Sequence, residues 1–160
     1  MISAAVLTIS DSVSAGTRLD RSGPAVRERL EQLGWRVAVM ETIPDVISEI
    51  SERLATLADG GQVSAIFTTG GTGVAPRDVT PEAARAILDR EIPGFGELMR
   101  LQGRAATPLA VLSRSLAGTR GKVLIVTLPG SPKGAVESLD AILELVPHVL
   151  ELLRGHTEHS

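Results

Sequence analysis

Apolar residues follow two different spacings along this chain, and the change from one to the other marks the predicted elements. Four short runs are almost continuously apolar, which is typical of β-strands buried on both faces. These runs lie at residues 4–9, 35–43, 63–69 and 122–130. The first ends at Ser10 and Asp11, two polar residues that mark the end of the strand.

Between the runs, apolar residues recur every three or four positions, which predicts helices with one buried face. The first helix begins at Pro24, and Gly34 suits its carboxyl-terminal cap. The second begins after Asp45, which is placed to cap it, and ends at Gly60. Their predicted buried faces consist of Val26, Leu30 and Leu33 in the first helix and of Ile47, Ile50, Leu54 and Leu57 in the second.

Two further helices have equally clear beginnings. Thr80 supplies a capping residue, Pro81 the first helical position and Glu82 an acid in the first turn. The last helix is predicted as one continuous stripe over residues 132–153, with apolar positions at Val136, Leu139, Leu143, Val146, Leu150 and Leu153.

Strands that alternate with helices predict right-handed crossover units and a mostly parallel sheet. We therefore expect an α/β fold, a three-layer α/β/α sandwich. The length of 160 residues suits one domain. We assign it to residues 1–154, followed by a flexible tail at 155–160. Only residues 91–122 have no clear period, and we expect a short helix in 91–103 and loops or short strands in 107–121.

The composition excludes several classes of protein. Aromatic residues make up only 2% of the chain, which argues against stacking surfaces for single-stranded nucleic acid. The net charge is −3 and no basic cluster stands out, so a partner that is a nucleic acid is not expected. Cysteine is absent, which excludes disulfides and thiolate metal sites. Because no apolar run is long enough to cross a bilayer and the start lacks a signal-peptide pattern, we expect a cytoplasmic protein without a membrane partner.

Polar residues with chemical potential follow each predicted strand. In a parallel sheet, ligands bind beyond the carboxyl ends of the strands, so these loops are expected to meet at one edge. They contain Ser10 and Asp11, then Asp45, then residues 68–78, and finally Pro129, Gly130, Ser131 and Lys133.

The loop TTGGTGVAPRD at residues 68–78 has three glycines in four positions, Gly70, Gly71 and Gly73. Glycine is costly to order, so something must come close to this backbone. A glycine-rich turn between a strand and a helix can present backbone N–H groups to a phosphate. The loop matches neither the Walker A motif nor the dinucleotide-binding fingerprint. Arg77 could neutralise phosphate, and Asp78 beside it suits a divalent cation, which together indicate a nucleotide with magnesium.

Four segments of the chain resemble one known family. They are TISDSVSAGTRLDRSGP (8–24), TIPD (42–45), TTGGTGVAPRDVTPEA (68–83) and SRSLAGTRGKVLIVTLPGSPKG (113–134). Together they are similar to the MogA/MoaB proteins of molybdenum cofactor synthesis, including the G domains of gephyrin-like fusion proteins. The resemblance covers residues 4–154. It implies an α/β/α fold, a homotrimer and molybdopterin adenylyltransferase activity, in which ATP and Mg²⁺ place AMP on the molybdopterin phosphate. A downstream molybdenum-insertion protein is an implied partner.

The resemblance also assigns roles to individual residues. It makes Asp45 and Asp78 the catalytic aspartates, which in our mechanism hypothesis also hold Mg²⁺. Binding of nucleotide, pterin or phosphate falls on the residues of the four loops: Asp11, Ser14, Gly16, Gly70, Gly71, Thr72, Gly73, Arg77, Pro129, Gly130, Ser131 and Lys133. A catalytic histidine is not needed, because a phosphate nucleophile requires no strong base, and all three histidines fall in the last helix or the tail.

Structural interpretations of the same residues stay open on sequence alone. Asp45 could be a helix cap. Arg77 could pair with a surface acid. Asp20 and Arg21 could be a solvated pair. The tryptophan and two methionines are interpreted as core or subunit contacts: Trp35, Met40 and Met99.

Two other functions also remain open. A homologue could bind molybdopterin without transferring a group, as a carrier or scaffold. Alternatively, the chain could be a nucleotide hydrolase related to the competence-damage proteins that share this domain. The choice between trimer and hexamer, between the molybdenum and tungsten pathways, and among Asp11, Asp45 and Asp78 as metal ligands is not decided by the sequence.

Overall fold

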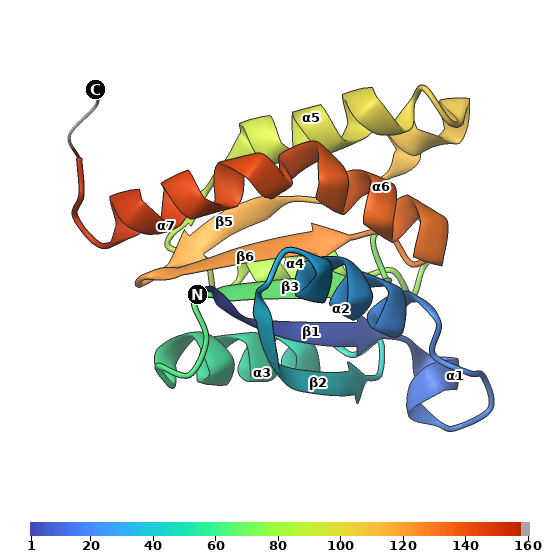
Figure 1. The fold of residues 1–160 in the computed structure, drawn as a ribbon. Coiled ribbons are helices and arrows are strands. Elements are labelled where there is room, and N and C mark those ends of the chain that lie inside the picture. Colours follow the sequence, from blue (N-terminus) through green and yellow to red (C-terminus); the bar gives the residue numbers. More distant parts are fainter. Residues whose placement is uncertain (158–160) are drawn as a thin grey trace.

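A single six-stranded sheet forms the middle of the molecule (Figure 1). The structure is a computed structural model that describes residues 1–157. The sheet has the strand order β2-β1-β3-β6-β5-β4. The strands are β1 (Ser3–Ile9), β2 (Arg36–Ile43), β3 (Ala65–Thr69), β4 (Arg90–Glu91), β5 (Ala117–Arg120) and β6 (Val123–Leu128). The four strands predicted from apolar runs are therefore confirmed, with boundaries shifted by a few residues.

The sheet is mostly parallel, as predicted. Strand β1 pairs in parallel with both β2 and β3, and β3 pairs in parallel with β6. At the far edge, β5 runs antiparallel to β6, and β4 runs antiparallel to β5. The two short antiparallel pairings lie in the region where the sequence showed no clear period. Strands this short present too few residues for a period to be recognised.

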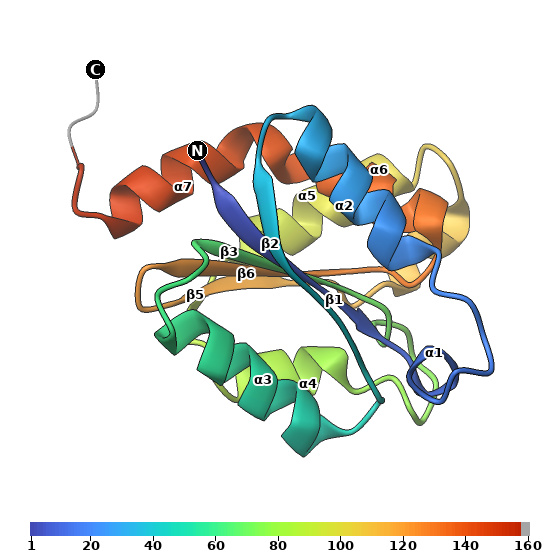
Figure 2. The same ribbon diagram turned by 60° about the horizontal axis from the view of Figure 1, so that its bottom comes forward.

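Helices cover both faces of the sheet, which confirms the three-layer α/β/α fold (Figure 2). One layer contains α2 (Ser22–Gln32), α5 (Pro93–Gly103), α6 (Pro132–Ile142) and α7 (Val146–Leu153). The other contains α3 (Ile47–Asp59) and α4 (Thr80–Arg85). Alternate residues of each central strand supply the two hydrophobic cores. Val6, Phe67 and Val126 face the first layer, whereas Leu7, Ile66 and Ile125 face the second.

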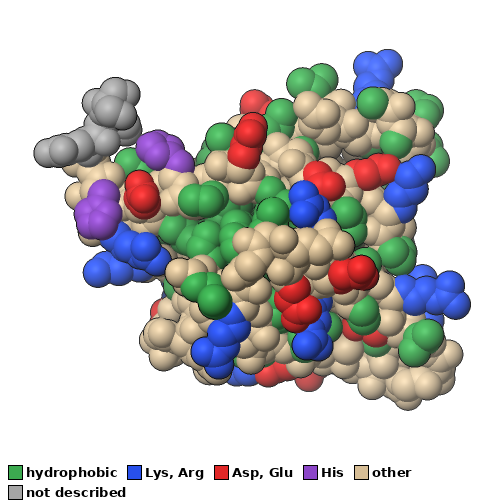
Figure 3. All heavy atoms as spheres, viewed as in Figure 1, with side chains coloured by type: hydrophobic (Ala, Val, Ile, Leu, Met, Phe, Trp, Pro, Cys, Tyr) green, Lys and Arg blue, Asp and Glu red, His purple; other side chains and the backbone are tan. Residues whose placement is uncertain are grey.

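Trp35, Met40 and Met99 lie in or against the first core. Trp35 stacks on Phe67 with 6.4 Å between the ring centroids, Met99 is buried, and Met40 packs against the same cluster. Apolar side chains also reach the surface on this side, where Figure 3 shows a hydrophobic area framed by charged groups. The core interpretation of these three residues is thus the one that the structure supports.

Several local predictions need correction, among them the predicted buried positions Leu33 and Ile47, which are exposed. A short helix, α1 (Asp11–Ser14), follows β1 where a loop was expected. The final helical stripe is divided into α6, a 3₁₀ turn at Leu143–Leu145 and α7. Pro147 lies in the first turn of α7, and its missing N–H prevents a continuous helix. Neither Asp45 nor Thr80 is a capping residue, because Val46 and Val79 hold those positions without a side-chain hydrogen bond.

The segment 91–122 contains the expected helix, α5, and a 3₁₀ turn at Pro108–Leu112 before strand β5. No helix among residues 1–157 is long and apolar enough to cross a membrane. The predicted tail falls partly at residues 158–160, which lie outside the described residues, so its flexibility stays a prediction, as does the domain boundary at 154.

Candidate active site

Three parallel strands end side by side, and their following loops touch. The Gly70 amide, just after β3, donates to the carbonyl oxygen of Leu128 at the end of β6 over 3.0 Å. Gly70 has φ +106°, and a Cβ there would lie 2.2 Å from the Ile9 carbonyl oxygen of β1. A Cβ on Gly130 would in turn lie 3.3 Å from the Gly70 Cα. The backbone that approaches this glycine turn is therefore the protein's own, and no side chain fits at Gly70.

The glycine turn is also held against the beginning of α4. Gly71 has φ +70°, and a Cβ there would meet the Thr80 hydroxyl at 2.3 Å. That buried hydroxyl donates to the Gly70 carbonyl over 2.9 Å, and the Thr80 amide donates to the Gly71 carbonyl over 3.1 Å. Thr80 therefore holds the glycine turn in place rather than capping a helix. This role depends on the contact between two separate segments, so the sequence alone does not reveal it.

Two of the predicted site aspartates exchange hydrogen bonds. The Asp11 amide donates to the Asp45 carboxylate, and the Asp45 amide donates to the Asp11 carboxylate, each over 2.9 Å. Arg77 completes this arrangement, because its Nε and Nη2 donate to the two carboxylate oxygens of Asp11, each over 3.0 Å. The ion-pair interpretation of Arg77 is thus realised, and its partner is another predicted site residue.

The carboxyl groups of Asp11 and Asp45 experience opposite electrostatic effects. The hydrogen bond from the Asp45 amide, followed by contact with Arg77, lowers the pKa of Asp11. Burial raises the pKa of Asp45, and the negative charges of Asp11 and Asp78 act in the same direction, although the Asp11 amide opposes them. Asp45 is therefore a carboxylate that a nearby cation would stabilise.

Asp78, at the end of the glycine loop, lies near enough to Asp45 for its charge to act on that carboxyl group. Its Oδ2 accepts a hydrogen bond from the Ala75 amide over 3.0 Å. A Cβ on Gly73 would lie 2.7 Å from that same oxygen, so the glycine leaves room for the carboxylate. Asp45 and Asp78 both line a cleft of about 320 Å³.

The cleft brings together only part of the predicted set. Six predicted residues line it: Asp45, Asp78, Gly70, Gly71, Gly130 and Ser131. The Ser131 hydroxyl accepts from the Gly134 amide over 3.0 Å and so caps α6. Backbone polar groups and carboxylates both line the cleft, so it can hold an anion and a cation together. The beginning of α6 is directed at it.

The other predicted residues lie around the cleft without lining it. Asp11 and Arg77 form the ion pair already described, and Gly73 lies against Asp78. Thr72 is buried, and the Pro129 carbonyl accepts from the Thr69 hydroxyl over 2.6 Å. Ser14 ends α1, and Gly16 follows it with φ +78° and no atom near its missing Cβ.

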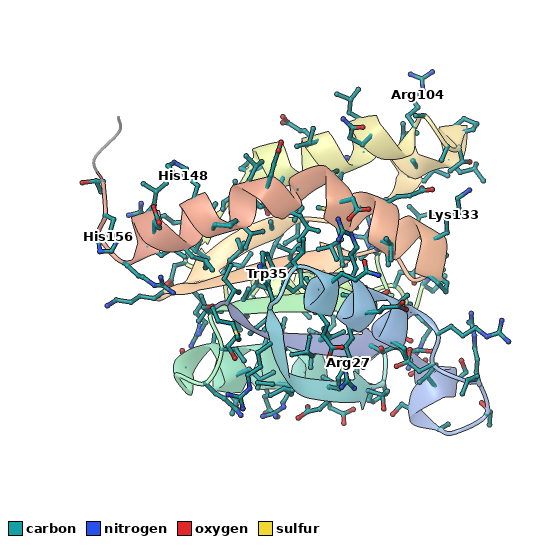
Figure 4. All side chains as sticks on the ribbon, viewed as in Figure 1. Arg27, Trp35, Arg104, Lys133, His148 and His156 are labelled. Atoms are coloured by element: carbon teal, nitrogen blue, oxygen red, sulfur yellow. The ribbon has the colours of Figure 1, made fainter. Side chains whose placement is uncertain are left out.

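Lys133, the last predicted residue, extends into solvent at the beginning of α6 (Figure 4). Its side chain is 83% exposed, and the nearest acid is Glu137 at 3.8 Å. His148 and His156 lie at the opposite end of the molecule in the same view, as the placement of the histidines in the sequence predicted.

One wall of the cleft was not predicted from the sequence. The segment before α2 contributes Arg18, Leu19, Asp20 and Arg21, α2 contributes its first residue, Ser22, and β1 contributes Thr8. Asp20 is not a solvated partner of Arg21. Its carboxylate accepts from the buried Thr8 hydroxyl over 2.8 Å and from the Gly23 amide over 3.0 Å. The topology could have predicted this wall, because a crossover helix that follows β1 must begin at the same edge of the sheet.

The described residues contain no group of three or more His, Cys, Asp or Glu side chains that could hold a metal ion alone. Two carboxylates near one another, Asp45 and Asp78, suit Mg²⁺ better than they suit a closed metal site. Mg²⁺ commonly takes one or two carboxylates and completes its shell with water and substrate phosphates.

The chain is similar to proteins of known name. Residues 5–148 match a family model described as "Probable molybdopterin binding domain". The molybdopterin adenylyltransferase of Helicobacter pylori strain J99 is 40% identical over 153 residues, which cover 94% of this chain and 87% of that protein. The Escherichia coli K12 protein of the same name is 38% identical over 164 residues, with coverage of 94% and 84%. The crystal structure of the molybdopterin biosynthesis enzyme MoaB from Thermus thermophilus superimposes with a TM-score of 0.91 at 50% identity, covering 97% of this chain and 98% of that one.

Proposed function

The chain belongs to the molybdopterin-binding domain family of molybdenum cofactor biosynthesis, and we propose that it is a molybdopterin adenylyltransferase. The observation that carries this proposal is the cleft in which Asp45, Asp78 and the Gly70–Gly71 turn meet at the ends of parallel strands. The named relatives support the same activity at 38–40% identity over most of the chain.

In the proposed reaction, a phosphate oxygen of molybdopterin attacks the α-phosphorus of ATP. The bond from that phosphorus to the bridging oxygen breaks, AMP is transferred, and pyrophosphate leaves with its electron pair. The nucleophile is already ionised at neutral pH, so the protein has to align two polyanions and offset their repulsion. The absence of a histidine, lysine or cysteine base among the described residues that line the cleft is consistent with this requirement.

Asp45 and Asp78 are the residues that would hold Mg²⁺. When bound, the ion offsets the negative charge on the ATP phosphates. The raised pKa of Asp45 supports this assignment, because a site that collects negative charge before any substrate arrives has a use for a cation. The loss of one such electrostatic contact is expected to cost roughly 3 kcal/mol of barrier.

We assign the positive charge that binds the phosphates to other residues than those suggested by the sequence. Two nitrogens of the Arg77 guanidinium already bind Asp11, and Lys133 does not line the cleft. Arg18 and Arg21 line the cleft, and neither takes part in the ion pairs found among residues 1–157. We therefore assign phosphate binding to Arg18, Arg21 and the amides at the beginning of α6.

Pyrophosphate release by the purified protein with ATP, Mg²⁺ and molybdopterin tests the proposal. Release that requires the pterin and disappears in Asp78→Ala would support the transferase. Binding of molybdopterin without release would instead make the chain a carrier, and release without pterin would make it a nucleotide hydrolase.

Three further properties are proposed on the family resemblance and the sequence. The chain forms a homotrimer, acts in the cytoplasm and passes its product to a molybdenum-insertion protein. Light scattering on the eluted protein measures the first of these, and a hexamer or monomer would contradict it.

A further inference from the structure

Few contacts hold the segment between Gly73 and Asp78 to the rest of the protein. Its internal bonds join Ala75 and Asp78 in both directions. Side chains of this segment are exposed, and Val74 shows 71% of its surface. One contact with the rest of the protein is the ion pair between Arg77, which belongs to this segment, and Asp11. A loop that is held so sparsely needs another restraint if Asp78 is to stay opposite Asp45.

Arg114, which precedes β5, supplies that restraint from outside the loop. Its Nε donates to the Gly73 carbonyl and its Nη2 to the Asp78 carbonyl, each over 2.8 Å. The two carbonyls are those at the two ends of the segment. The Arg114 amide also donates to the Thr72 carbonyl over 2.8 Å, so the same residue binds three carbonyls of the glycine loop.

The remaining donor group of the guanidinium anchors it to α4. Nη1 donates to both carboxylate oxygens of Glu82, over 2.6 and 3.0 Å. Glu82 lies in the first turn of α4, which begins two residues after Asp78. All three nitrogens of the guanidinium are therefore engaged in contacts within the protein.

We infer that Arg114 is a positioning residue, which sets the place of Asp78 by holding the carbonyls of Gly73 and Asp78. The inference rests on the proposed function, since it concerns the residue proposed to hold Mg²⁺. A planar guanidinium with fixed donor directions suits this task, whereas a lysine ammonium cannot reach two carbonyls and a carboxylate with the same geometry. Residues that orient a metal ligand typically affect metal affinity or activity by about 10- to 100-fold when they are replaced.

The chain offers a matched control in Arg120. Like Arg114, it binds a carboxylate and a backbone carbonyl oxygen through its guanidinium: two nitrogens donate to Asp59 and the third to the Ile87 carbonyl. Its side chain is 29% exposed, against 35% for Arg114. Arg120 belongs to β5 and lies outside the cleft, so Arg120→Ala removes a comparable set of contacts without touching the glycine loop.

The experiment compares Arg114→Ala, Arg114→Lys, Glu82→Gln and Arg120→Ala with the wild-type protein. Pyrophosphate release is measured over a range of Mg²⁺ concentrations, and Mg²⁺-dependent binding of ATP is measured by calorimetry. We expect Arg114→Ala and Arg114→Lys to raise the half-saturating Mg²⁺ concentration or lower kcat by about 10- to 100-fold, with the KM for molybdopterin within about twofold of wild type. Glu82→Gln, which keeps the arginine but weakens its anchor, should show a smaller effect in the same direction.

Three outcomes would overturn the inference. Equal kinetics and Mg²⁺ dependence in Arg114→Ala and Arg120→Ala would mean that Arg114 contributes only to the general stability of the protein. Wild-type kinetics in Arg114→Lys would show that charge alone suffices. A loss confined to the KM for molybdopterin would mean that Arg114 touches the pterin. If Arg114→Ala does not fold, the lysine and Glu82 variants decide the question.

Hydrogen exchange separates this inference from the proposed function. Peptides that cover residues 72–78 should exchange faster in Arg114→Lys than in Arg120→Ala, whether or not the wild-type protein releases pyrophosphate. A wild-type protein without release would contradict the proposed function alone, and unchanged exchange in that segment would contradict the role of Arg114.

Discussion

Asp11 and Asp45 are held together by two reciprocal hydrogen bonds, in which the amide of each residue donates to the carboxylate of the other over 2.9 Å. The pair joins the end of β1 to the end of β2, so the two strands present their aspartates at one place. Because Arg77 binds Asp11 and not Asp45, the two carboxylates differ in character. The charge of Asp11 is balanced by Arg77, whereas Asp45 takes part in none of the ion pairs found among residues 1–157.

Asp45→Asn is expected to stabilise the protein at neutral pH while abolishing activity. Its folded-state pKa is raised above the usual value of 3.8 by burial and by the charges of Asp11 and Asp78. The folded state therefore loses stability as the pH rises from this value through the higher folded pKa, and the asparagine variant escapes that loss. The amide oxygen can still accept from the Asp11 amide.

Thermal unfolding between pH 3 and pH 8 in a chelating buffer measures this effect. The Tm of Asp45→Asn should exceed that of wild type at pH 7, and the difference should close below about pH 4. Asp59→Asn is a control of opposite sign, because hydrogen bonds from Arg120 lower the pKa of Asp59. Its Tm should fall below wild type at pH 7, with the gap closing as the pH falls. A lower Tm for Asp45→Asn at pH 7 would refute the prediction.

Arg77 is expected to act through Asp11 rather than through a phosphate. If so, Asp11→Asn and Arg77→Gln remove the same interaction, and the double variant should lose no more activity than the worse single variant. If the losses of kcat/KM in the two single variants multiply in the double variant, Arg77 contacts the substrate directly. Stability should change little in each variant, because the pair is largely exposed.

Arg18 and Arg21 are expected to bind the anionic substrates. Replacing either with glutamine should weaken the binding of ATP or molybdopterin by about tenfold, as for the loss of a hydrogen bond to a charged group. The effect should shrink at high salt, since screening weakens exposed charge interactions. Arg36→Gln, at the amino-terminal end of β2, is the control and should bind as wild type does. Affinities equal to wild type in both cleft variants would rule out this assignment.

Gly70→Ala is expected to be the most damaging small substitution in the glycine loop. The new Cβ would lie 2.2 Å from the Ile9 carbonyl oxygen at a residue with φ +106°. Gly61→Ala is a control for the backbone conformation alone, because Gly61 has φ +75° and no atom within 4 Å of the added Cβ. We expect the control to cost about 1 kcal/mol. Gly70→Ala should cost roughly 2 kcal/mol more, because of overpacking. Denaturant unfolding measures both, and equal losses would show that the close approach to Ile9 has no energetic weight.

The sequence alone determined the four parallel strands, the main helices between them and the edge at which the site forms. Buried strands such as residues 4–9 and 63–69 consist of continuous apolar runs, and helices have apolar residues every three or four positions. Local spacing along the chain therefore indicates which residues are buried. Parallel strands must end at a common edge, and that rule is sufficient to place Asp45, Asp78 and Gly70 near one another. The family resemblance pointed to the same residues.

Only the tertiary structure decided what each polar side chain contacts. Asp45 looked like a helix cap, yet its carboxylate accepts from an amide that is 34 residues away. Arg77 looked like a phosphate ligand, yet it binds Asp11, and Arg114 reaches across to hold Gly73 and Asp78. Such contacts leave no period in the sequence, because they depend on where separate loops cross and on the fixed directions of hydrogen-bond donors. Local spacing records which residues are buried, and the packing of the loops determines how the charged groups pair.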